Sequence, residues 1–415
     1  MSEGALSGVR VVEVGHFMAA PFCAMQLGDL GADVVKVENP DGGDGVRATA
    51  PFLQGESSHF IRLNRNKRSL ALDLKSPRGK EVFRRLVQGA DVLVENLRPG
   101  TMADLGLDWP RLSASNPRLI YVAASGWGQD GPYAARPGLD IMAQAMSGLM
   151  SITGEESEQA EGQERDESGE AGGRKAPVKV GVPVTDLVCA LYGALGAVAA
   201  LRAREHTGRG QFIDVSLFES GVSLAIWEAG RYFATGELPR PLGSAHQSSA
   251  PYQALRAEDG FFTLGVTSPR TWEACCDALG LAHLKNDARF DKNHLRHQNR
   301  RELIPLLEAV TMQRSAQHWV AKLMESGVPC APIQDYGQVF RDPHLLARDY
   351  FPKAPHTRLG PVEQLRSPMR MSETPPRIDR AGPLLGEHSI EVLGELGYAP
   401  AEIEALAHAG VVRVP

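Results

Sequence analysis

The chain has 415 residues, of which 43% are hydrophobic and 23% charged, and its formal net charge is −6. A chain of this length predicts two or more domains, each able to bury a sizeable core. The mildly acidic balance argues against a nucleic-acid partner. The five cysteines are odd in number and show no metal-ligand spacing, and the first residues lack the apolar core of a signal peptide. We therefore expect a cytoplasmic protein with reduced cysteines and no metal.

The N-terminal third alternates between short apolar strands and helices. This βαβ alternation predicts an α/β fold with a Rossmann-like, doubly wound parallel sheet, whose ligands bind beyond the carboxyl ends of the strands. The first turn, residues 15–21, lacks the second and third glycines of a dinucleotide-binding fingerprint, so a nicotinamide cofactor is not expected. The predicted strands are residues 9–14, 32–38, 69–74, 90–96 and 118–128, and the predicted helices include residues 21–31 and 77–89.

A cluster of cations lies beside the third predicted strand. Arg65, Lys67, Arg68 and Lys75 fall within a few residues of one another. Such a cluster can meet phosphates by charge and hydrogen bonding. It is more often a solvated face, and the sequence alone leaves both readings open.

Residues 187–201 are uncharged and rich in Ala, Leu and Gly. This run is shorter than the roughly 20 residues that span a bilayer, so it predicts a buried helix and no membrane partner. Pro183 precedes the run and Gly208 follows it, which places Asp186 at or near the N-cap. Asp186 is then either a capping residue or a nucleophile or base whose ionised form the helix N-terminus stabilises. Position alone favours the cap.

The composition changes after the first 150 residues. Residues 154–175 carry eight acidic residues and no large apolar side chain, so we expect a mobile surface insertion. The predicted domains are a large α/β domain over 1–220, a linker over 221–250 and a small α/β domain over 251–330 that contains a hairpin turning at 258–260. Residues 331–415 are expected to pack back on the large domain.

Seven blocks in one order along the chain resemble CoA-transferase family III. They are GHFMAAPFCAMQLGDLGADVVKVE, NRNKRSLALDLKSPRGK, ENLRPGTMADLGL, ASGWGQDGPYAARPGLDIMAQAMSGLM, VKVGVPVTDLVCALYGALGA, TGRGQFIDVSLFES and PLLGEH. The resemblance runs from about Leu6 to Val412, and the acidic insertion is not part of the family pattern. It implies an enzyme that exchanges CoA between acyl-CoA and small carboxylic acids, without a tightly bound cofactor. It also implies a homodimer whose ring-like chains interlock.

The resemblance places Asp186 on the family's nucleophilic aspartate. That residue attacks the donor thioester to give an anhydride and then carries CoA as an aspartyl thioester. The resemblance also implies CoA contacts. His16, Phe17, Met18 and Ala19 match the loop over the thioester, and Leu72, Lys75, Asn96, Leu97, Arg98 and Thr101 match positions along the nucleotide and pantetheine. Asn39 and Asp104 stand where the formyl-CoA member has arginines, so Arg98 or Arg136 is expected to meet phosphates instead.

The same resemblance bears on the substrate. Residues 243–249 lack the glycine-rich loop of the formyl-CoA branch and look like the branch that uses succinyl-CoA and a dicarboxylate. His246 would then hydrogen-bond a distal carboxylate, or it is an ordinary surface residue. Asp140 is either a helix cap or a hydrogen-bonding group near the reaction centre.

Two other functions compete with this interpretation. The racemase branch of the superfamily, which epimerises 2-methylacyl-CoA, carries a histidine where this chain has Leu139, and leucine cannot transfer a proton. A CoA-binding protein without turnover would not need Asp186. The sequence therefore favours the transferase.

Overall fold

The computed structural model describes residues 4–156 and 176–415, which form two compact units. Unit 1 combines the described parts of Met1–Leu149 with Val180–Gly230 and His344–Pro415. Unit 2 combines the described parts of Met150–Lys179 with Arg231–Pro343. Most of the predicted acidic insertion lies outside the described residues.

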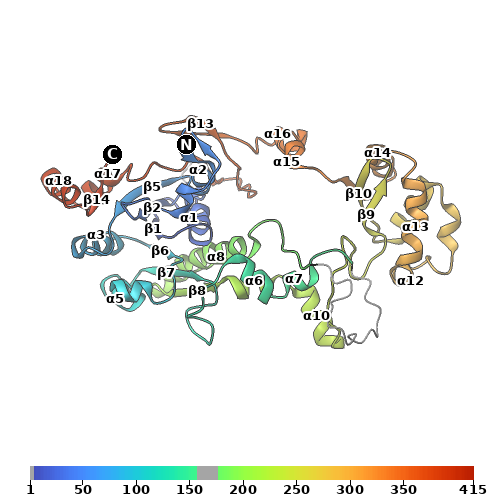
Figure 1. Ribbon diagram of the computed structural model, residues 1–415, viewed down its shortest axis with the longest axis horizontal. Helices are drawn as coiled ribbons and strands as arrows, with labels where there is room; N and C mark the ends of the chain where they lie inside the picture. The colour runs from blue at the N-terminus through green and yellow to red at the C-terminus, as the bar shows by residue number, and fades with distance from the viewer. Residues whose placement is uncertain (1–3, 157–175) are drawn as a thin grey trace. The chain divides into compact units, whose positions relative to one another are not determined.

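Unit 1 is built on a seven-stranded sheet in the order β14-β5-β2-β1-β6-β7-β8 (Figure 1). All neighbouring strands are parallel except β14, which pairs antiparallel with β5. Apart from β14, this is the order of a doubly wound sheet, so the predicted α/β class is confirmed. The strands are β1 (Arg10–Val14), β2 (Asp33–Glu38), β5 (Lys67–Leu72), β6 (Val92–Glu95), β7 (Ile120–Ser125), β8 (Phe212–Ser216) and β14 (Val412–Arg413).

Helices cover both faces of this sheet because alternate strand residues point to opposite sides. Val11 and Val34 pack against α1 (Ala19–Asp29) and α8 (Val184–Thr207). Val12 and Val35 belong to the core on the other face. That core is completed by α3 (Pro77–Gln88), α4 (Thr101–Leu105), α5 (Trp109–Ser115), α17 (Ser389–Glu395) and α18 (Pro400–His408).

Helix α8 is the long apolar helix that the sequence predicts. By length and composition alone it could cross a membrane. In unit 1 its small residues instead pack closely, since a Cβ on Gly193 would lie 3.2 Å from both Cys23 Sγ and Val122 Cγ1. The opposite side of the helix is exposed and still apolar, with Leu195 63% exposed. The helix is therefore half buried rather than fully buried.

Shorter elements complete unit 1. They are η1 (Gly45–Ala48), β3 (Phe52–Leu53), β4 (Glu56–Ser57), α2 (Ser58–Leu63), α6 (Asp140–Met146), α9 (Leu217–Ser223), β12 (Lys353–His356) and β13 (Gly360–Glu363). Three further helices reach across the limits of the two units: α7 (Leu149–Ile152), α10 (Ile226–Thr235) and α16 (Pro343–Ala347).

Unit 2 has its own core around a three-stranded antiparallel sheet in the order β11-β10-β9. The predicted hairpin is present, as β9 (Tyr252–Ala257) and β10 (Gly260–Gly265) pair directly. Trp272 and Phe262 are buried at the centre of this core. The other elements are β11 (Cys330–Pro332), α11 (Pro269–Leu279), η2 (Ala282–Asn286), α12 (Asn293–Gln298), α13 (Arg300–Thr311), α14 (Ala316–Glu325) and α15 (Tyr336–Val339).

Candidate active site

Asp186 lies in the first turn of α8. The helix begins at Val184, its N-cap is Pro183, and no side chain caps it from that position. Asp186 is the third helical residue, so the prediction of a capping role is wrong. Among the described residues its carboxylate accepts no hydrogen bond and forms no ion pair, which leaves its oxygens free for chemistry.

Asp140 connects α6 to the start of α8. Its Oδ1 accepts hydrogen bonds from the Thr185 backbone N at 3.0 Å and from Thr185 Oγ1 at 2.7 Å. Its Oδ2 accepts from Gln144 Nε2 at 2.7 Å. Asp140 does not cap its own helix, whose N-cap is Leu139. It instead satisfies a first-turn N–H of α8, one residue before Asp186.

The two carboxylates interact electrostatically. Burial, followed by the negative charge of Asp140, raises the pKa of Asp186 from 3.8 to about 7. The direction of this shift is opposite to the one expected from the helix N-terminus alone, which favours the ionised form. The raised pKa brings the titration of Asp186 close to neutral pH. An acyl group on this oxygen would remove its charge and relieve the repulsion.

The loop His16–Ala19 follows β1 and leads into α1. His16 donates its backbone N–H to Asn96 Oδ1, and Asn96 Nδ2 donates to the His16 carbonyl, both at 2.9 Å. Ala19 belongs to a small apolar cluster with Cys189, which lies one turn after Asp186. The structure therefore brings together the predicted thioester loop, Asn96 and the first turns of α8.

This convergence lies at the switch point of the sheet. Strand β1 has β2 on one side and β6 on the other, and connections diverge from it in both directions. Ligands of doubly wound sheets bind in the crevice at such a point. The loop follows β1 and Asn96 follows β6, so both border that crevice.

The other predicted CoA residues extend along the same edge. Lys75 is exposed after β5, whereas the Leu72 side chain is buried in the core. Thr101 begins α4, and Arg98 Nη2 donates to the Ala135 carbonyl at 2.9 Å. This bond brings Arg98 to the segment that carries Arg136, so the two predicted phosphate ligands lie on adjacent segments.

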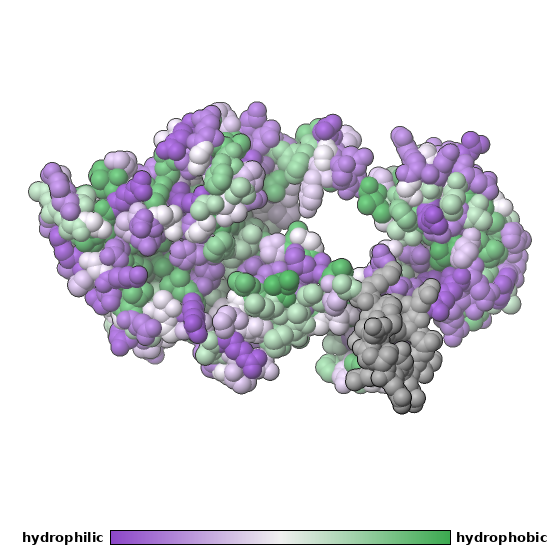
Figure 2. All heavy atoms as spheres, viewed as in Figure 1, coloured by the Kyte–Doolittle hydropathy of each residue, from purple (hydrophilic) through white to green (hydrophobic). Residues whose placement is uncertain are grey.

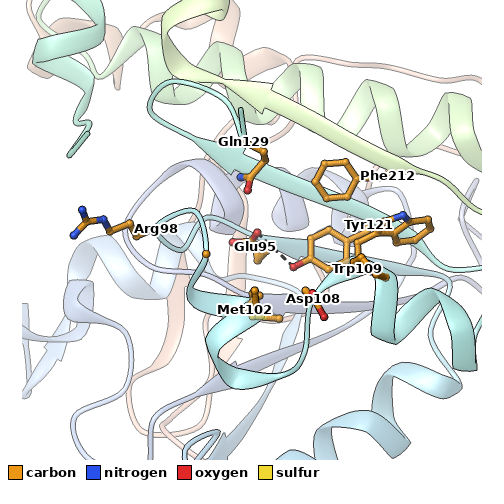
Figure 3. A pocket seen from close by; sticks show the side chains of 11 residues that line it. Glu95, Arg98, Met102, Asp108, Trp109, Tyr121, Gln129 and Phe212 are labelled. Carbon is orange, nitrogen blue, oxygen red and sulfur yellow. Dashed lines mark hydrogen bonds between the residues drawn. The ribbon is translucent and has the colours of Figure 1, made fainter. Parts of the chain in front are cut away.

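Glu95 is a buried group that the sequence reasoning missed. It lines a cavity of about 220 Å³ whose walls include Trp109, Tyr121 and Phe212 (Figure 3). Glu95 Oε2 accepts from the Leu97 backbone N at 2.7 Å, and burial raises the pKa of Glu95 to about 7. Glu95 thus holds the turn that carries Asn96 and the predicted ligand Leu97. Its position at the end of the apolar strand VLVE was the available signal.

The cationic cluster is mostly buried. Arg65 pairs with Asp29 at 2.6 Å, and Lys67 pairs with Glu13 at 2.7 Å. Arg68 is 8% exposed and binds three carboxylates, which belong to Asp33, Glu391 and Glu395. Both interpretations from the sequence, a phosphate site and a solvated face, are wrong for these three residues, because each forms ion pairs with carboxylates of the fold.

His246 belongs to unit 2. Its Nδ1 accepts from the Ser248 backbone N at 3.1 Å, and its ring lies edge-on to Tyr252 with centroids 4.9 Å apart. The loop 243–249 is thus folded around this histidine. Its role toward a substrate stays a prediction.

Unit 1 combines a doubly wound sheet, the loop His16–Ala19 at the switch point and an unpaired, half-buried carboxylate near that loop. These are features of an α/β protein that binds its ligand at this edge of the sheet.

The chain belongs to CoA-transferase family III, whose family model matches residues 6–389. It is 36% identical to succinyl-CoA:glutarate CoA-transferase of Mus musculus, covering 98% of this chain and 90% of the relative. It is also 36% identical to succinate–glutarate CoA-transferase of Agrobacterium fabrum, covering 94% and 95%. A crystal structure of a CaiB/BaiF family protein from Brucella suis is 36% identical, with a TM-score of 0.82 over 95% of this chain and all of that chain. The protein is therefore a CoA-transferase.

Proposed function

We propose that this protein transfers CoA from succinyl-CoA to a dicarboxylic acid through covalent intermediates on Asp186. The carboxylate attacks the succinyl thioester, which forms a mixed anhydride and releases the CoA thiolate. The thiolate attacks the aspartyl carbonyl, which gives an aspartyl-CoA thioester and free succinate. The acceptor carboxylate displaces the thiolate to form a second anhydride. The thiolate then takes the acceptor acyl group and restores the Asp186 carboxylate.

The unpaired carboxylate of Asp186 is the observation that carries this proposal. A nucleophile that is already hydrogen-bonded must break those bonds before it attacks. Burial and the charge of Asp140 keep the pKa of Asp186 near neutrality, which makes the ionised oxygen more basic than an ordinary aspartate. A sheltered site also protects an anhydride from water.

The remaining residues have binding roles in this proposal. The loop His16–Ala19 covers the thioester, while Asn96, Leu97 and Thr101 line the pantetheine. Lys75, Arg98 and Arg136 meet the phosphates, since all three are exposed cations along the ligand edge. His246 hydrogen-bonds the distal carboxylate of a dicarboxylic acid. The relatives named for succinyl-CoA and glutarate support this substrate class.

The racemase alternative is not favoured. Epimerisation needs two acid or base groups on opposite faces of a carbon, and Leu139 offers none. The relatives are named as transferases.

We further propose that the protein is an interlocked homodimer in the cytoplasm. Unit 1 exposes an apolar face on α6 and α8, formed by Leu139, Ile141, Met142, Leu191 and Leu195. Figure 2 shows hydrophobic side chains gathered over α6. Apolar patches of this kind mark interaction sites. All five cysteines are free thiols, which fits a reducing compartment. Sedimentation at nanomolar protein tests the dimer, and an active monomer at that concentration contradicts it.

Trapping the intermediate tests the chemistry. The enzyme is incubated with succinyl-CoA and then treated with borohydride or hydroxylamine, and the peptides are mapped by mass spectrometry. We expect the modification on Asp186 in the wild type and no exchange in Asp186→Asn. A variant that keeps full exchange, or an adduct that maps elsewhere, refutes the proposal.

A further inference from the structure

Four fully buried charged side chains lie beneath the loop His16–Ala19. Glu13 in β1, Lys36 in β2, Lys67 in β5 and Asp44 before η1 all have 0% exposure. Two carboxylates face two ammonium groups, so the charges balance. Burying four charges is costly and adds little stability, whereas fixing a geometry is one established use of such a cluster.

Lys36 and Lys67 donate hydrogen bonds to backbone carbonyls on either side of the loop. Lys36 Nζ lies 2.6 Å from Glu13 Oε1, 3.0 Å from Asp44 Oδ2 and 2.9 Å from the Gly15 carbonyl, to which it donates. Lys67 Nζ donates to Glu13 Oε2 at 2.7 Å and to the Pro21 carbonyl at 2.8 Å. One backbone carbonyl just before the loop, at Gly15, and one in the first turn of α1, at Pro21, thus accept from buried ammonium groups.

Asp44 holds the middle of the loop. Its Oδ1 accepts from the Phe17 backbone N at 3.0 Å and lies 3.7 Å from His16 Nδ1. Phe17 has φ of 59°, a left-handed conformation that is unfavourable for an aromatic residue and needs support from its surroundings. The Phe17 ring packs on Gly45, where a Cβ would lie 2.9 Å from Cζ of the ring. Phe17 is 59% exposed, so few side-chain contacts hold it, and its backbone bond to Asp44 is a direct restraint on its conformation.

We propose that Asp44, backed by Lys36, is a positioning residue for CoA transfer: it fixes the Phe17 backbone so that the loop meets the thioester at the correct distance from Asp186. The inference rests on the proposed function of the loop. Asp44 itself touches neither substrate nor nucleophile in this proposal. It acts by transmitting the rigidity of β1, β2 and β5 to the loop.

Three variants test the proposal. Asp44→Ala removes both the acceptor and the charge. Asp44→Asn keeps an oxygen for the Phe17 N–H, and Lys36→Met with Asp44→Asn also restores charge balance between Glu13 and Lys67. The matched control is Asp29→Asn, which breaks a buried ion pair with Arg65 at the end of α1 opposite the loop.

The first readout is the rate of Asp186 acylation in single-turnover experiments with succinyl-CoA. Asp44→Ala is expected to slow it about a hundredfold, the effect of a small misplacement of reacting groups. Asp44→Asn is expected to slow it about tenfold, since one neutral acceptor replaces a charged one. The double variant is expected to fold as well as the wild type and to remain slow. Asp29→Asn is expected to lower the melting temperature without slowing the acylation rate of the folded enzyme.

The second readout does not depend on activity. Hydrogen exchange of the segment 16–20 is expected to accelerate in Asp44→Ala and in the double variant, but not in Asp29→Asn. Unchanged exchange in the loop overturns the proposal, and so does an acylation rate that falls equally in the Asp29 control. If the wild type forms no adduct on Asp186, the proposed function fails, while the exchange experiment still decides whether Asp44 positions the loop.

Discussion

Asp140 is expected to set the pH dependence of the nucleophile. Its carboxylate is the second cause, after burial, of the rise in the pKa of Asp186 to about 7. Replacing Asp140 with Asn removes this charge and is expected to lower the pKa of Asp186 by about one unit. Because the ionised carboxylate is the reactive form, the acid limb of kcat/KM moves to lower pH. At pH 6 the ionised fraction rises from about one-tenth to about one-half, so kcat/KM relative to its own plateau rises about fivefold.

The hydrogen bonds of Asp140 require a control. An asparagine amide would face Gln144 Nε2, donor against donor, so local packing also changes. Thr185→Val is the matched variant, because it deletes a hydroxyl that donates to Asp140 but keeps the charge. We expect its acid limb to stay near pH 7. The assay is kcat/KM for succinyl-CoA from pH 5 to 9, and an unchanged limb in Asp140→Asn refutes the electrostatic reasoning.

Three further outcomes are expected. Asp186→Asn should stabilise the fold at pH 8 by about 1–2 kcal/mol, a value reduced for the partial exposure of Asp186, and should not stabilise it at pH 4. The reason is that the raised pKa of the Asp186 carboxyl makes the native state lose stability as the pH rises from 4 to 7. Equal shifts in melting temperature at both pH values contradict this. Gly193→Leu should lower the free energy of unfolding by about 1–3 kcal/mol, because the leucine side chain would clash with Cys23. Gly230→Ala should not lower it, because an added Cβ there has no neighbour within 4 Å among the described residues outside its own helix; thermal unfolding measures both. The double variant Arg98→Ala with Arg136→Ala should raise KM for succinyl-CoA about tenfold and leave kcat nearly unchanged. Substrates made with 3′-dephospho-CoA should reveal which phosphate these arginines bind. An effect on kcat alone argues against phosphate binding.

The sequence by itself determined the α/β class of unit 1, and its family resemblance singled out Asp186 as the predicted nucleophile. Short apolar strands that alternate with amphipathic helices are typical of a doubly wound parallel sheet. The observed strand order β5, β2, β1, β6, β7 and β8 agrees with that fold. The uncharged run after Asp186 likewise required close packing, which Gly193 provides. Local periodicity suffices for such features because burial of apolar surface decides them.

Only the tertiary structure decided how the charges are used. Lys67 and Arg68 looked like ligands or solvated side chains, yet they are buried against Glu13 and Asp33, which are distant in the sequence. The sequence also did not predict that Asp140 binds Thr185 on α8 or that the pKa of Asp186 is raised. The energy of a charge depends on its burial and on neighbours from other segments, and the chain acquires both only when it folds.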